Sequence, residues 1–136
     1  MEELAEDLMT LVQIALLLVG VLAIFFTYVN YRVIVNSHEK EREAMILGNY
    51  LLSSDCLTYL NITSLFSEDN LISMKNDPSC LKYPSFFVSV EILNSNPQQI
   101  WEFSKDISTF EGSSEINVAV RLNTGEVKQA LMAVNV

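Results

Sequence analysis

The sequence predicts an α+β protein in which one long N-terminal helix packs on a C-terminal antiparallel β-sheet. Residues 8–29 are apolar and uncharged, and residues 30–52 continue in a helical pattern of apolar and charged positions. In residues 85–136, apolar side chains recur at every second position of several short stretches. A helix and a sheet that each have one apolar face bury those faces against each other, which gives two layers.

The composition excludes one class of partner. The chain of 136 residues has 8 Lys and Arg against 17 Asp and Glu, and its formal charge is −9. Because no Lys or Arg cluster interrupts this acidity, the basic surface that nucleic-acid binding requires is missing. No nucleic acid is expected as a partner. The hydrophobic share is nevertheless 50%, because the apolar residues are concentrated near the N-terminus.

The apolar stretch at residues 8–29 is long enough to cross a bilayer. At about 1.5 Å per residue it covers roughly 33 Å as a helix, close to the ~30 Å hydrocarbon core. A secretory signal peptide has a basic start and a shorter apolar region, whereas this chain starts MEELAED. We interpret residues 1–29 as a transmembrane helix or a helix in the core of a filament, with contacts to other helices predicted at Gln13, Ala15, Gly20 and Ala23.

Residues 30–52 are predicted to continue the same helix, from about residue 3 to about residue 52. The stretch has no proline, and its one glycine, Gly48, comes late. The charged residues 38–43 supply a solvated face. The apolar positions beside it form a stripe that suits a sheet packed on one side: Ile34, Ala44, Leu47 and Leu51, with Met45 next to them.

The third segment, residues 53–136, is predicted to hold a loop and then the sheet. Residues 53–84 are rich in Ser, Asn and Asp, which predicts an ordered loop with one short helical turn that begins near Ser67. Four antiparallel strands follow at 85–93, 98–103, 115–122 and 127–136. The side chains predicted to face inward are Phe86, Val88, Val90, Ile92, Ile116, Val118, Val120, Leu122, Ala130, Met132, Val134 and Val136.

Two features favour an extracytoplasmic location for residues 53–136. Cys56 and Cys80 are the only cysteines, and an even pair in a small domain is typical of a disulfide in an oxidising compartment, although two cysteines can also be buried thiols. Asn61 begins the single N-x-S/T sequon and is a candidate glycosylation site.

The distribution of basic residues points the other way. No Lys or Arg precedes the apolar stretch, and Arg32, Lys40 and Arg42 follow it, so the positive-inside rule alone would leave the C-terminal part in the cytoplasm. We give the cysteines and the sequon more weight. The prediction is a single-pass protein of the cell membrane with its C-terminal domain outside.

The order of elements resembles that of archaeal type IV pilin-like membrane proteins. The resemblance is carried by the continuous helix and by the stretches LGNYLLSSDCLTY, SCLKYPSFFVSVEI and INVAVRLNTGEVKQALMAVNV. It covers nearly the whole chain by residue type and order, without a diagnostic short motif. The resemblance implies a structural subunit of an extracellular filament, assembled through the apolar helix from copies of itself or from related subunits.

The start of the chain departs from the pilin pattern. Pilin precursors have a basic leader that ends in Gly or Ala, followed by a mature apolar start with an acid at its fifth position. Here Glu6 or Asp7 is the candidate for that acid, in a different register. Either the leader is absent from this numbering or the protein is an unprocessed pilin-like relative.

We expect neither an enzyme nor a cofactor. The sequence contains no G-x-x-x-x-G-K-[ST], G-x-G-x-x-G, H-E-x-x-H or C-x-x-C motif. The single histidine, His38, has no Cys or second His at helical spacing for a metal site and is expected to be solvated. The rival to a filament subunit is a membrane-anchored accessory or binding subunit of a larger complex, or a virion membrane protein. A filament contains many copies of the chain, whereas an accessory subunit occurs in few.

Overall fold

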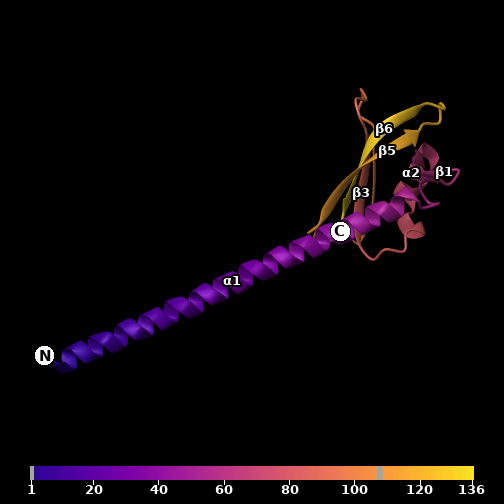
Figure 1. The fold of residues 1–136 in the computed structure, drawn as a ribbon. Helices are drawn as coiled ribbons and strands as arrows, with labels where there is room; N and C mark the ends of the chain where they lie inside the picture. The colour runs from indigo at the N-terminus through magenta and orange to yellow at the C-terminus, as the bar shows by residue number, and fades with distance from the viewer. Residues whose placement is uncertain (1, 107–108) are drawn as a thin grey trace. The chain divides into compact units, whose positions relative to one another are not determined.

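The computed structural model describes residues 2–106 and 109–136, with side chains from residue 7 onward (Figure 1). The chain divides into two compact units, Met1–Asn36 and Ser37–Val136. The elements in order are α1 (Glu2–Leu52), β1 (Thr58–Tyr59), β2 (Ile62–Ser67), α2 (Glu68–Asn76), the 3-10 helix η1 (Pro78–Cys80), β3 (Phe86–Ile92), β4 (Ile100–Lys105), β5 (Ser113–Arg121) and β6 (Val127–Asn135).

Helix α1 is continuous over the range that the sequence predicts. No proline interrupts it, and the two glycines inside it, Gly20 and Gly48, do not break it. The short second helix is also confirmed. It begins after Ser67, which has the extended backbone of an N-cap, and Glu68 and Asp69 in its first turn favour the positive end of the helix dipole.

The Ser37–Val136 unit contains one mixed, curled sheet in the order β1-β2-β5-β6-β3-β4. The pairs β3–β4, β3–β6 and β5–β6 are antiparallel, as expected for the four predicted strands. Strand β2 pairs with β5 in parallel, with Phe66 opposite Val120. The sheet is therefore not antiparallel throughout, and the segment 53–84, expected to be a loop, contributes two of its strands.

The core of this unit lies between one face of the sheet and the end of α1 (Figure 1). Ala44, Leu47 and Leu51 are buried, at three-residue and then four-residue spacing on one side of the helix. All the predicted inward positions of β3 and β6 are buried. Two members of the predicted stripe are exposed instead. Ile34 belongs to the first unit, and Met45 is turned about 100° around the helix from Ala44.

Gly112 allows the helix and the start of β5 to approach closely. A Cβ atom at this position would lie 2.2 Å from the carbonyl oxygen of Lys40. The Gly112 N–H donates to the carbonyl oxygen of Val136 at 3.2 Å, and the Val136 N–H donates back at 3.1 Å. Because both backbones are held, only glycine fits here.

Candidate functional site: the apolar segment of helix α1

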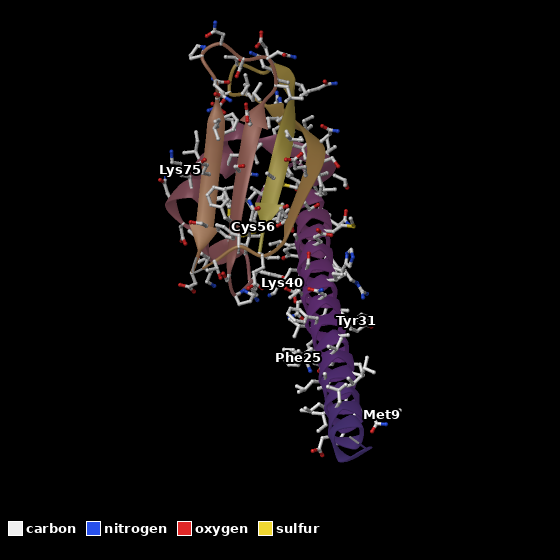
Figure 2. All side chains as sticks on the ribbon, turned by 90° about the vertical axis from the view of Figure 1, so that its left-hand side faces the viewer. Met9, Phe25, Tyr31, Lys40, Cys56 and Lys75 are labelled. Carbon is white, nitrogen blue, oxygen red and sulfur yellow. A yellow bond between two sulfur atoms is a disulfide. The ribbon has the colours of Figure 1, made fainter. Side chains whose placement is uncertain are left out.

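The apolar segment of α1, residues 8–29, has every side chain exposed. The exposed fraction reaches 69% at Leu17 and 73% at Ile24. Figure 2 shows Met9 and Phe25 on this segment, with Tyr31 just beyond it, projecting from the helix. Apolar side chains surround the helix on all sides, and such a helix is stable only in lipid or among other apolar helices. The apolar segment is therefore the candidate functional site.

By length and composition, α1 is the one helix in the described part of the chain that can cross a membrane. One hydroxyl group of the apolar segment is hydrogen-bonded within the helix, as a hydrocarbon environment favours. The Thr27 Oγ1 donates to the carbonyl oxygen of Ala23 at 2.8 Å. Just past the segment, the Arg32 Nε donates to the Tyr28 hydroxyl at 3.0 Å, and the guanidinium lies 5.5 Å from the centre of that ring.

The Tyr28–Arg32 pair marks one end of the apolar segment. A tyrosine and a basic residue one helical turn apart suit the boundary between hydrocarbon and water, because both side chains combine an apolar body with a polar end. No contact between Tyr28 and Arg32 is predicted from the sequence. The four-residue spacing is the signal that could have linked them.

The four predicted helix-packing residues do not share one face. Gln13, Gly20 and Ala23 follow each other at intervals of seven and three residues, which places them along one side of the helix. Ala15 points in a different direction. At Gly20 an added Cβ would meet nothing within 4 Å in this chain, so a constraint on its size would come from another molecule.

The two cysteines form the predicted disulfide. Cys56 and Cys80 are bonded, with their Cα atoms 6.2 Å apart. The bond closes a loop that contains β1, β2 and α2, and in the chain-entropy model a loop of this size contributes ~3 kcal/mol. A disulfide of this kind favours an oxidising, extracytoplasmic compartment for the Ser37–Val136 unit.

The sequon residue Asn61 lies in the turn between β1 and β2. It is exposed and has a φ of 59°, and Thr63 at the third position of the sequon is also exposed. The structure thus leaves the Asn61 amide accessible. Glycosylation at this residue stays a prediction.

His38 lies on the solvated side of the helix. Its Nδ1 is 3.6 Å from the Glu41 Oε2, and its side chain is 75% exposed. Among the described residues, no three His, Cys, Asp or Glu side chains are grouped in a way that could hold a metal ion.

A small charged cluster lies at the start of the Ser37–Val136 unit. The Lys40 Nζ donates to the Glu43 Oε2 at 3.2 Å, and this hydrogen bond, followed by the charges of Glu43 and Glu111, raises the pKa of Lys40 above 10.5. Burial raises the pKa of Tyr83 above 10.0, and Glu43 adds to the effect. The three charged side chains and Tyr83 line a hollow of about 470 Å³.

Comparisons of the chain with known protein families, curated proteins and solved structures found no match. The architecture itself is pilin-like: a long N-terminal helix, apolar in its first part, packs through its last turns on a C-terminal sheet. This likeness concerns the arrangement of elements.

Proposed function

We propose that this chain is a structural, non-catalytic subunit of an extracellular pilus-like filament. The observation that carries the proposal is the exposed apolar segment 8–29 on a helix whose last turns form part of the core of a small sheet domain. In a filament, the apolar segments of many copies would cover each other. Before assembly, the same segment would hold the subunit in the cell membrane, with residues 53–136 outside.

Two further observations support this proposal. The disulfide is typical of proteins outside the cytoplasm. The face that contains Gln13, Gly20 and Ala23 gives neighbouring helices a place for close approach, since small residues let helix backbones come near each other. The partners we propose are other copies of this chain or related subunits, and the membrane.

The test is the substitution Gly20→Leu in the full chain. Leucine is favourable in a bilayer, and a Cβ atom at Gly20 has nothing within 4 Å in this chain, so membrane insertion is expected to stay intact. Packing between helices would be blocked, and filaments should be reduced or lost. Electron microscopy of surface material counts the filaments, and membrane fractionation measures insertion.

The matched control is Leu17→Ile, which preserves volume and polarity and should change neither quantity. Normal filaments from the Gly20→Leu variant would exclude Gly20 from the packing surface. If wild-type material contains no polymers, and the chain is instead recovered at low copy number beside a larger protein, the membrane-anchored accessory subunit becomes the better assignment.

A further inference from the structure

The turn between β1 and β2 exposes an apolar tip. Tyr59 pairs with Ile62, so Leu60 and Asn61 form a two-residue hairpin loop, and their φ angles are 49° and 59°. Loops of this kind prefer Asn-Gly or Asp-Gly, because a bulky side chain is unfavourable at positive φ. Leu60 is nevertheless 75% exposed and Ile62 50% exposed. Packing within this chain therefore gives no reason for a leucine at this position.

An apolar hollow lies elsewhere on the same unit. Ile46, Leu47 and Tyr50 of α1, together with Lys82 and Tyr83, line a volume of about 370 Å³. Lys82 can add the apolar stem of its side chain to the wall. An apolar cavity of about 150 Å³ is sufficient for a benzene molecule, so the hollow has room for the side chains of the tip.

The tip and the hollow are both uncovered in the single chain. Leu60 is three-quarters exposed, and Ile46 and Tyr50 are each more than half exposed. An apolar projection that fits a hollow elsewhere on the same molecule joins copies head to tail, and repetition of such a contact builds an open polymer. We propose that the tip, residues 60–62, of one copy docks in the hollow around Tyr50 and Tyr83 of the next copy.

This inference rests on the proposed filament and adds a contact between sheet domains to the contact between apolar segments. It also gives a reason for a leucine at a position with positive φ, because this side chain would contact the neighbouring copy. A glycan on Asn61 would cover the tip. Docking and glycosylation therefore exclude each other, and docking is the use of this turn that we favour.

The contact can be tested by photo-crosslinking in assembled filaments of the full chain. A benzophenone amino acid replaces Leu60, and material labelled with ¹⁴N is assembled together with material labelled with ¹⁵N. Mass spectrometry is expected to find cross-links between differently labelled copies, on peptides that contain Tyr50 or Tyr83. Cross-links only to lipid, only to other parts of the chain or to another protein would overturn the proposal, and so would a glycan on Asn61.

A second measurement separates docking from folding. Glycine accepts positive φ, so Leu60→Gly should keep or raise the unfolding temperature while it reduces the number of filaments at least tenfold. The control is Val127→Thr, which removes apolar surface at a residue that is 58% exposed and should preserve filaments. Normal filaments from Leu60→Gly would refute the docking and leave the proposed function standing. No filaments from the wild type would refute both.

Discussion

The two parts of helix α1 have the same backbone conformation and opposite surroundings. In the apolar segment, residues 8–29, every side chain is exposed, whereas Ala44, Leu47 and Leu51 in the last turns are buried in the core. The arrangement of apolar residues around the helix makes this difference. A stripe on one side can be covered by the sheet of the same chain, while an apolar surface on all sides needs lipid or other helices. One continuous helix can thus serve both to complete a domain and to join it to something else.

The largest expected effect comes from shortening one leucine in each part. Leu47 is 1% exposed, so Leu47→Ala should leave a cavity and lower the free energy of unfolding by about 2–5 kcal/mol. Leu17→Ala removes an exposed side chain and should change this quantity by less than about 0.5 kcal/mol. The single tryptophan, Trp101, lies in the core of the Ser37–Val136 unit. Its fluorescence during thermal or chemical unfolding of the full chain in detergent reports both variants.

Equal destabilisation by the two substitutions would mean that the apolar segment also supports the sheet domain. A small effect of Leu47→Ala would mean that the end of the helix can leave the sheet at little cost. Either result would contradict the division of α1 into an apolar segment that contacts other molecules and last turns that belong to the core of the domain.

A smaller effect is expected from adding a methyl group to a glycine in each unit. At Gly112 the new Cβ would lie 2.2 Å from the backbone of Lys40, so the helix and β5 would have to separate. Gly112→Ala should lower the free energy of unfolding by about 1–3 kcal/mol. Gly20→Ala is the matched control and should not affect unfolding of the domain, because nothing lies within 4 Å of its Cβ position. An unchanged unfolding temperature for Gly112→Ala would contradict the close approach.

Much of the fold could be predicted because its apolar patterns are regular. The alternation Phe86, Val88, Val90, Ile92 identifies β3, and all four side chains are buried as expected. The extent of α1 follows from the lack of proline, and the disulfide from the even pair of cysteines. In the first two cases a local pattern decides the element, and the disulfide follows because the chain has only one pair of cysteines.

Strand β2 could not be predicted, because its position depends on a backbone partner far away in the sequence. Only Phe66 among its residues is fully buried, its burial does not alternate, and Ser64 has a φ of 66°. Parallel pairing with β5 stabilises it through hydrogen bonds that leave no side-chain pattern. Strand β1 has two residues, too few to show a period.

The candidate site was predictable in its extent and less so in its detail. The absence of charge between residues 8 and 29 defines the apolar segment from composition alone. The exposed tip at Leu60 gives no signal in the sequence, because Leu-Asn is not a pair that predicts a hairpin loop. The hollow around Tyr50 combines residues from two separate stretches of chain, so only the folded structure brings it together.

The smallest expected effect is a pH dependence of stability that comes from Asp77, in the Ser37–Val136 unit, and is absent from the apolar segment. The Asp77 Oδ1 accepts a hydrogen bond from the Ser79 N–H at 3.0 Å and caps η1. Hydrogen bonds from the side chain and then the backbone of Ser79 lower the pKa of Asp77 below 3.8. A lowered folded pKa stabilises the fold above about pH 3.8, and this contribution disappears as the pH falls through the folded value.

Asp77→Asn should therefore lower the unfolding temperature of the Ser37–Val136 unit slightly at neutral pH, and the difference from wild type should shrink below pH 3.8. Asp55→Asn removes the same charge from an exposed position without changing the Ser79 hydrogen bonds, and it is the control for the loss of one negative charge. Residues 8–27 contain no titratable side chain, so the helix signal of the apolar segment should be constant over the same range. If the unfolding temperatures of Asp77→Asn and wild type differ by the same amount from pH 7 to pH 2, the charge of Asp77 does not contribute to the stability of the cap. In that case the ionisation of Asp77 would not make the stability of the Ser37–Val136 unit depend on pH.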